Sequence, residues 1–331
     1  MDTLAFLPGK QALHAYLFAH FIGEQEDGEQ IYFAVSQDGL HWQDLNHKQP
    51  VLYSTVGERG VRDPFLLRSG DGSCFYLLAT DLSIYHRGGW TDSNATVTGS
   101  RSIIVWESPD LVKWSEPRRV EVAPKEAGCA WAPEAIYDEE AEDYLVFWAS
   151  SREAADGMGR GLHIYASKTQ DFRTFTEAEL FITRGEHQTV IDTTIIRAEG
   201  RYYRASGDGH ITIESSDHLL GEWKIISTLE SLGLGLTGKD VEGPEFFKFN
   251  HDEQWGLLVD QYATEQGYLP ILTSNIGDTT GDCWRIPAPE EYSFGQLKKR
   301  HGTILPITQS EYEAILDRWG KEFPPVRSVK S

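Results

Sequence analysis

The chain has 331 residues, and its 40% apolar and 12% aromatic content is enough for a packed core. It carries 30 basic and 51 acidic side chains, so the net charge is −21, which disfavours nucleic acid and anionic membrane as partners because both would repel it. No apolar run approaches the length that crosses a bilayer, so we expect no membrane partner either.

The N-terminus indicates an intracellular protein. An acid, Asp2, and no basic stretch precede the first apolar residues, which is not the pattern of a secretory signal peptide. We therefore expect a cytoplasmic location. Cys74, Cys129 and Cys283 share no CxxC spacing, so neither a disulfide framework nor a zinc site is predicted, and we interpret all three as thiols of the core.

One pattern recurs along the chain: a strand that ends in Ser or Thr, a polar turn that usually holds Asp, and then an aromatic residue. Each copy follows two strand-like stretches, and units of three or four antiparallel strands are typical of propeller blades. Because five units fill the chain, we predict one all-β domain over residues 1–331, a five-bladed β-propeller. The copies are SQDGLHW (36–42), SPDLVKW (108–114), SKTQDFRTF (167–175), SSDHLLGEW (215–223) and TSNIGDTTGDCW (273–284).

The two ends of the sequence complete this prediction. The first unit, residues 12–46, lacks one strand, and RHGTILPIT (300–308) would supply it and close the ring, which removes exposed sheet edges. An apolar stripe then predicts a C-terminal helix at about 309–319. Ser310 and Glu313 have the spacing of a capping box at its start.

Acidic residues open three of the predicted inner strands. Asp63 lies in VRDPFLL, Asp192 in IDTTII and Glu242 in VEGPEFF, while Ala132 takes this place in the third unit. An aspartate before proline is also a common turn former. However, the first strand of each blade lines the central channel, so acids at equivalent points of three blades would converge on one pit. We interpret them as a functional site.

Crowded carboxyls in a partly desolvated cavity do not all ionise easily, so at least one pKa is raised. A protonated carboxyl beside an ionised one is what glycosidic cleavage needs, since one group protonates the leaving oxygen and the other activates water. Trp131 and Trp90 are candidates for stacking on sugar faces. Arg204, one strand beyond the second aspartate, and His20, which flanks the first inner strand, are further candidate binding residues.

The residues resemble those of glycoside hydrolase family 43. The resemblance covers nearly the whole chain and rests on RDP at 62–64, WAPE at 131–134, IDT at 191–193 and EGP at 242–244, in this order. The family comprises five-bladed propellers that include α-L-arabinofuranosidases, β-xylosidases, arabinanases and galactan-active enzymes.

The resemblance implies an inverting mechanism in which Asp63 is the general base and Glu242 the general acid. Asp192 would hold the acid in place and tune its pKa, although Thr193 follows it where the family usually has proline. Relatives often hold a calcium ion or a water cluster on the axis through a single histidine, and His301 is the candidate here. No cofactor is expected to be required.

The expected function is an exo-acting glycosidase that releases terminal L-arabinofuranosyl residues from short oligosaccharides. A β-xylosidase, a galactofuranosidase or a galactan-directed glycosidase remains an alternative, because these activities would use the same carboxylates. An alternative of another class is a non-catalytic propeller that binds carbohydrate or protein, but that reading gives no reason for three opening acids.

Overall fold

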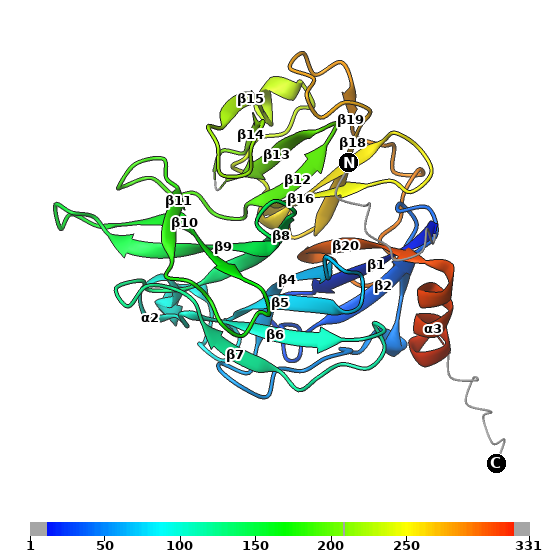
Figure 1. Ribbon diagram of the computed structural model, residues 1–331, viewed down its shortest axis with the longest axis horizontal. Coiled ribbons are helices and arrows are strands. Elements are labelled where there is room, and N and C mark those ends of the chain that lie inside the picture. The colour runs from blue at the N-terminus through cyan, green and yellow to red at the C-terminus, as the bar shows by residue number, and fades with distance from the viewer. Residues whose placement is uncertain (1–11, 208, 321–331) are drawn as a thin grey trace.

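The computed structural model describes residues 12–207 and 209–320 of the chain. Its strands form five four-stranded antiparallel sheets arranged around one axis (Figure 1). The predicted fold, a five-bladed β-propeller with a short C-terminal helix, is confirmed. Among the described helices, none is both long and apolar enough to span a membrane. The N-terminal stretch with Asp2 lies outside the described residues.

Each blade places one strand at the axis, and the innermost strands β20, β4, β8, β12 and β16 contact one another around the ring. From the axis outward, the blades are β20 (Arg300–Thr308), β1 (Leu13–Phe21), β2 (Tyr32–Ser36) and β3 (Gln43–Asp44); β4 (Val61–Arg68), β5 (Phe75–Asp81), β6 (Ser102–Ser108) and β7 (Arg118–Glu121); β8 (Trp131–Asp138), β9 (Asp143–Glu153), β10 (Arg160–Thr169) and β11 (Glu179–Ile182); β12 (Thr194–Ala198), β13 (Arg201–Ser206), β14 (Thr212–Ser216) and β15 (Lys224–Thr228); β16 (Glu242–Lys248), β17 (Trp255–Asp260), β18 (Tyr268–Thr273) and β19 (Trp284–Arg285).

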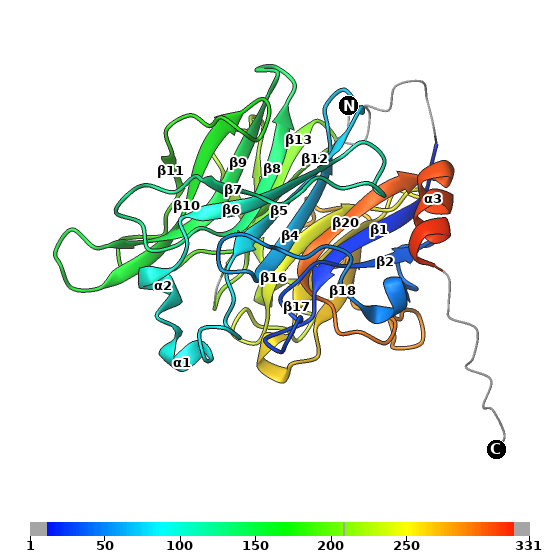
Figure 2. The ribbon, with the colours of Figure 1, turned by 90° about the horizontal axis from the view of Figure 1, so that it is seen from below.

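The first blade is built from both ends of the described chain. Strand β20 pairs with β1 in antiparallel register, from Leu13 opposite Thr308 to Phe21 opposite Arg300. Figure 2 shows the two strands side by side, with the C-terminal helix α3 next to them. The innermost position of this blade is therefore filled by the last strand, and β1 is the second strand from the axis.

The hydroxyl at the end of each third strand fixes the turn that follows it. In every blade this oxygen accepts the N–H of a residue two or three positions further on, which stabilises the turn. In the third and fourth blades this residue is Thr169 and Ser216, not Ser167 and Ser215 as the sequence pattern placed it. The hydroxyls belong to Ser36, Ser108, Thr169, Ser216 and Thr273.

Helix α3 (Gln309–Trp319) follows directly on β20. Its N-cap is Thr308, whose Oγ1 accepts the N–H of Glu311 at 3.3 Å, while Glu311 Oε2 accepts the N–H of Thr308 at 2.8 Å. The capping box predicted at Ser310 and Glu313 is therefore wrong by two residues. The reason is that Thr308 still has extended backbone angles as the end of β20, so the helix begins immediately after it.

The other helices are short and lie in connecting loops. Two of them follow β5 and project from the second blade (Figure 2). These two are α1 (Trp90–Ser93) and α2 (Ala95–Thr98). The remaining three are the 3₁₀ turns η1 (Asn46–Lys48), η2 (Glu230–Leu232) and η3 (Tyr262–Thr264).

The apolar side chains gather at the seams between neighbouring blades. Trp106 is buried in the cluster between the first and second blades, and Trp148 in the one between the second and third. Each such side chain contributes roughly 1.5–3 kcal/mol by its removal from water. Because five seams surround the axis, the inner strands are held in fixed positions relative to one another.

Of the three cysteines, only Cys129 lies in the core as predicted. Cys74 is partly buried, and Cys283 is exposed, so the interpretation of all three as core thiols is wrong. Cys283 belongs to the turn before β19, where its N–H donates to Asp278 at 2.8 Å, and the turn lies at the surface.

Candidate active site

The innermost strands begin with a β-bulge, in which the pairing with the second strand slips. The slip lies between Arg62 and Phe65 in β4, and at the matching places of β8, β16 and β20. In four of the blades, one residue at the bulge position has left-handed backbone angles. Such angles are uncommon for residues other than glycine and are often found at functional sites. The residues are Asp63 (φ 49°), Ala132 (46°), Asp192 (51°) and Gly243 (56°).

This repeat corrects the predicted equivalence of the three acids. Asp63 and Asp192 occupy the same point of their blades, but the equivalent residue of the fifth blade is Gly243, and Glu242 lies one position earlier. A side chain at Gly243 would collide with the axis, since a Cβ there would lie 2.9 Å from Cγ of His301. The acid of this blade therefore projects from the preceding position, which Arg62 occupies in the second blade.

His301 lies between the two equivalent aspartates. Its Nδ1 is 3.5 Å from Oδ1 of Asp63 and 3.8 Å from Oδ1 of Asp192. The other oxygen of Asp192 accepts the N–H of Gly243 at 3.1 Å, which ties it to the residue after Glu242. The ring thus brings together all three acids that the sequence singled out.

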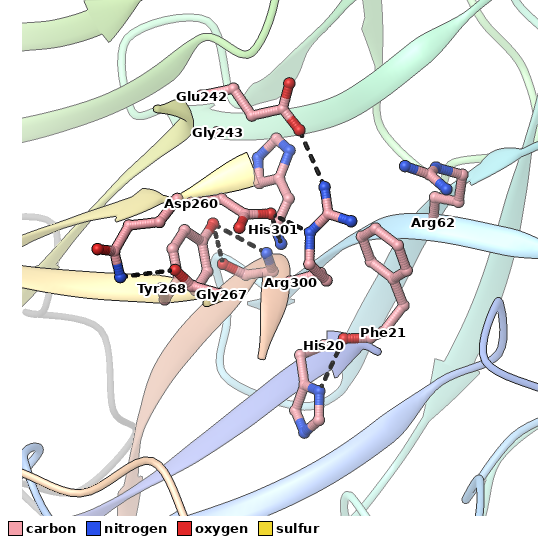
Figure 3. Close-up of polar contacts among 12 residues, drawn as sticks. His20, Phe21, Arg62, Glu242, Gly243, Asp260, Gly267, Tyr268, Arg300 and His301 are labelled. Atoms are coloured by element: carbon pink, nitrogen blue, oxygen red, sulfur yellow. Dashed lines mark hydrogen bonds and ion pairs between the residues drawn. The ribbon is translucent and has the colours of Figure 1, made fainter. Parts of the chain in front are cut away.

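Glu242 is held by an arginine that it shares with other acids. Nη2 of Arg300 donates to Oε1 of Glu242 at 3.1 Å, and Nε of Arg300 donates to the buried Asp260. Glu24 lies 3.6 Å from Nη1 of the same arginine. Figure 3 shows Arg300 between Glu242 and the ring of Phe21.

The surroundings of Glu242 keep its carboxyl protonated at neutral pH. Burial, together with the carboxylates of Asp192 and Asp260, raises the pKa of Glu242 to about 8, against the lowering effect of Arg300 and Arg62. The arginine does not reverse the shift, because its charge is divided among several carboxylates. A carboxyl in this state can donate a proton to a leaving group.

Asp63 is in the opposite state. Burial acts to raise its pKa, but the hydrogen bond and charge of His301, with Arg62, lower the pKa of Asp63 below its usual value. Thr80 supports the carboxylate further, since its hydroxyl donates to Oδ2 at 2.8 Å and accepts the N–H of Ala132 at 2.7 Å. Asp63 is therefore ionised and anchored, as a general base must be.

The axial histidine does not fit the role of a metal ligand. Burial acts to lower its pKa, but Asp192, Asp63 and Glu245 raise the pKa of His301 to about 9. A protonated imidazole has no lone pair to offer to a cation. Within the described parts of the chain, no group of three or more His, Cys, Asp or Glu side chains is arranged to hold a metal.

Two tryptophans lie together near this pit. The ring of Trp90, which is 51% exposed, meets the ring of Trp131 edge to face at 6.1 Å between centroids. The guanidinium of Arg62 lies over Trp90 at 5.1 Å and over Phe21 at 4.5 Å. Since Trp131 precedes the bulge residue of the third blade, the pair forms an aromatic edge beside the acids.

His20 is not brought to the acids. It is completely buried, and its Nδ1 contacts the carbonyl oxygen of Phe21 at 3.1 Å. Figure 3 shows its ring pointing away from Glu242 and Arg300. Burial and the charge of Lys299 lower the pKa of His20 well below its usual value, so it is a neutral side chain of the first blade.

Arg204 is likewise part of a blade interior. It is buried, and its Nε and Nη2 donate to Oε2 of Glu214 at 3.0 and 2.6 Å. Its guanidinium lies over Trp223 at 4.3 Å and over Phe181 at 5.7 Å. None of these three partners belongs to the pit, so Arg204 forms a structural ion pair inside the blade.

Sequence reasoning missed the two arginines of the pit and the acids that hold them. Arg62 and Arg300 directly precede Asp63 and His301, and Glu24 accepts a hydrogen bond from Arg62 at 2.7 Å. The signal was present, because RDP and RHG align once the bulges are superposed. Finding this signal requires the register of the bulges, which the motifs alone do not give.

Comparisons with known proteins agree with this fold. The chain is 28% identical to an α-L-arabinofuranosidase of Bifidobacterium longum, over 86% of its own length and 30% of that protein. It therefore spans less than a third of this curated relative. Among solved structures, the fold matches the family 43 BlXynB protein from Bacillus licheniformis with a TM-score of 0.52, at 14% identity, over 87% of this chain and 58% of the other.

A second solved structure, described as a glycoside hydrolase, matches with a TM-score of 0.53 at 12% identity, over 86% of this chain and 94% of the other. Residues 11–313 match the family Glyco_hydro_43_rel, described as a probable glycosyl hydrolase domain. The resemblance to family 43 expected from the sequence motifs is thereby confirmed. The chain belongs to this family of glycosyl hydrolase domains related to glycoside hydrolase family 43.

Proposed function

We propose that this domain is an inverting exo-glycosidase that releases terminal L-arabinofuranosyl residues from short oligosaccharides. The observation that carries the proposal is the split state of two carboxyls around one pit, with Glu242 protonated and Asp63 ionised. The arabinofuranosyl specificity is supported by the curated relative, which is an α-L-arabinofuranosidase. The expected cytoplasmic location stays a prediction.

In the first part of the reaction, Glu242 donates its proton to the glycosidic oxygen as the bond to the sugar breaks. Arg300 contacts the same carboxyl at 3.1 Å and stabilises the carboxylate that this transfer leaves behind. The carboxylate of Asp192 has the opposite effect before the transfer, because it raises the pKa of Glu242. Asp192 is thus a positioning residue, which also holds the backbone next to the acid.

Asp63 acts on the other reactant. Its ionised carboxylate removes a proton from a water molecule, which attacks the anomeric carbon on the face opposite the leaving group. Thr80 and His301 hold this carboxylate from two sides, so its orientation is fixed before substrate arrives. Attack on the opposite face gives a product of inverted anomeric configuration.

The proposal is tested with p-nitrophenyl glycosides of α-L-arabinofuranose, β-D-xylose, β-D-galactofuranose and β-D-galactose. The wild type is expected to cleave the arabinofuranoside, and Asp63→Ala to reduce kcat by about 10²–10⁴-fold. Glu242→Ala is expected to reduce kcat by a similar factor on an arabinofuranosyl oligosaccharide, whose leaving group needs the proton. Turnover of another glycoside alone would replace the proposed sugar. Turnover of none, with sugar binding retained, would favour a non-catalytic binding domain.

Two further readouts assign the roles of the acids. An activated leaving group such as dinitrophenol needs little protonation, so it should restore activity in Glu242→Ala but not in Asp63→Ala. Proton NMR of the first-formed product should show the inverted anomer. Retained configuration would contradict the assignment of Asp63 as a base.

A further inference from the structure

Two glutamates are buried together on the axis, one level below the catalytic acids. Glu134 of β8 and Glu245 of β16 are 4% and 2% exposed. Each lies two residues beyond the bulge position of its strand, and because side chains alternate along a strand, both point toward the axis like the acids above them. The two carboxyl groups hydrogen-bond to each other, and Thr194 Oγ1 donates to Oε2 of Glu245 at 3.1 Å.

The geometry of this pair requires a shared proton. If both groups were ionised, Oε2 of Glu134 would have no donor among the described residues, at a site that water does not solvate. One proton shared between the two carboxyls gives this oxygen a hydrogen-bond role and leaves a single negative charge on the pair. Burial and the neighbouring glutamate raise the pKa of Glu134 well above its usual value, and burial raises the pKa of Glu245 to about 7. Glu134 therefore holds the proton and Glu245 the charge.

The charge of Glu245 faces the ring of His301. The carboxylates of Asp63 and Asp192 contact this ring from above, and the backbone N–H of His301 donates to Asp260. Burial raises the pKa of Tyr268 well above its usual value, so this phenol, which meets the imidazole edge to face, stays neutral. The ionisable groups around the ring are Asp63 from β4, Asp192 ahead of β12, Glu242 and Glu245 from β16, Asp260 from β17, Tyr268 from β18 and Arg300 from β20.

We propose that Glu245, paired with the protonated carboxyl of Glu134, is a positioning residue whose negative charge holds His301 as the imidazolium that orders Asp63 and Asp192. The inference deepens the proposed function and rests on it for its role in catalysis. Asp63 takes up a proton during the reaction, and His301 then loses one of its anionic partners. Glu245 is not consumed by the chemistry, so it keeps the ring charged until Asp63 is ionised again.

A cavity on the far side of the pair is consistent with this role. A space of about 220 Å³ is lined by the continuing inner strands, with Glu245, Thr194 and Thr303 at its inner end. The lining residues follow the bulges in sequence, so the cavity lies on the side of the glutamates away from the pit. Glu245 therefore lies between the pit and this cavity, and substrate in the pit would not contact it directly.

The test is an NMR titration of His301 in protein with isotope-labelled histidine, without substrate. In the wild type the ring is expected to titrate near pH 9, and in Glu245→Gln at least about one pH unit lower, because a facing charge is lost. In the same variant the ring becomes neutral at lower pH, so kcat/KM should begin to fall at a lower pH than in the wild type on the alkaline side of the profile. A His301 titration that is identical in both proteins would overturn the proposal.

The matched control is Glu134→Gln, which replaces the shared proton by an amide donor of similar shape. Since Glu245 keeps its charge and a hydrogen bond, His301 is expected to titrate as in the wild type. If Glu134→Gln lowers the titration as much as Glu245→Gln does, the assigned charges are wrong and the proposal fails. If Glu245→Gln does not fold, the His301 titration of the wild type still tests the proposal, because a ring that titrates near pH 6.5 contradicts it.

These outcomes are separable from those of the proposed function. The titration needs no substrate. A lowered His301 titration in Glu245→Gln with no cleavage of the arabinofuranoside would therefore keep the proposed role of Glu245 toward His301 and remove the sugar assignment. Cleavage with an unchanged titration would do the reverse.

Discussion

Two buried arginines of this propeller, Arg204 and Arg300, make opposite kinds of contact. Arg204 gives two hydrogen bonds to one oxygen of Glu214 and is covered by aromatic rings, so its charge is balanced by one partner. Arg300 is divided among Glu24, Glu242 and Asp260. A carboxyl that has only a share of an arginine can still keep its proton, as the raised pKa of Glu242 shows.

The difference teaches how a buried ion pair can be told from a functional cluster. Breaking a closed pair is costly because it leaves one buried charge without a partner, but the pair offers nothing to a ligand. A shared arginine leaves one acid protonated and available for proton transfer. The predictions below change the shared cluster and the closed pair, in order of decreasing expected effect.

The largest effect is expected at the acid itself. Glu242→Gln keeps the hydrogen bond to Arg300 but removes the proton that is transferred, so kcat should fall by about 10²–10⁴-fold. In the wild type, activity should be lost as pH rises through about 8, because the acid works only when protonated. The residual activity of the variant should lack this alkaline limb in a pH–rate profile. A limb that persists would assign the proton to another group.

The same substitution at both arginines gives the sharpest test of the comparison. Lysine keeps the charge but not the fork of donors. Arg300→Lys should lower kcat/KM by about 10–100-fold, because Glu242 is no longer held in place while Asp260 is paired. Arg204→Lys should lower the free energy of unfolding by about 1–2 kcal/mol and leave kcat/KM unchanged. Thermal unfolding and steady-state kinetics of both variants check this. Equal losses of activity in the two variants would contradict the assignment of Arg300 to the site and of Arg204 to the blade interior.

A moderate effect is expected at the axial ring. The folded chain raises the pKa of His301 from 6.5 to about 9, so its contribution to stability is full below pH 6.5 and is lost as pH rises to 9. That contribution is on the order of 3 kcal/mol. His301→Gln should remove the fall in melting temperature that is expected for the wild type between about pH 6.5 and 9. It should also move the acidic limb of kcat/KM upward, because the pKa of Asp63 is no longer lowered by the ring.

The smallest effect is expected at the exposed edge of the pit. Trp90→Ala removes an aromatic surface beside Trp131, so KM should rise by roughly 3–10-fold with kcat nearly unchanged. Stability should change by less than about 0.5 kcal/mol, because the ring is half exposed. Trp90→Phe serves as the control that retains a stacking face. A large fall in kcat would mean that this loop orders the acids themselves.

Much of the fold was predictable, because blades repeat a local signal. The hydroxyl that ends each third strand and the turn after it are sequence-local, and they fixed the number of blades. The starting position of α3 was missed by two residues, because the end of β20 decides which residue can be the N-cap. Spacing alone did not distinguish Thr308 from Ser310.

The site residues were predictable where a sequence motif marks their position. They were not predictable where the pairing between strands determines which side chain enters the pit. Asp63 and Asp192 follow from the repeat. The register of Glu242 and the role of Arg300 depend on the bulges, which are set by pairing between strands. Arg204 was a reasonable candidate from its distance along the chain, but the side on which its strand faces places it inside a blade.

The strand that carries Arg300 and His301 has a consequence for the order in which the protein matures. Strand β20 is synthesised last of the described strands, yet it fills the axis of the first blade. A growing chain therefore contains Asp63, Asp192 and Glu242 well before it contains the residues that set their proton states. Arg300 and His301 therefore join the proposed catalytic acids only when the last described strand closes the ring.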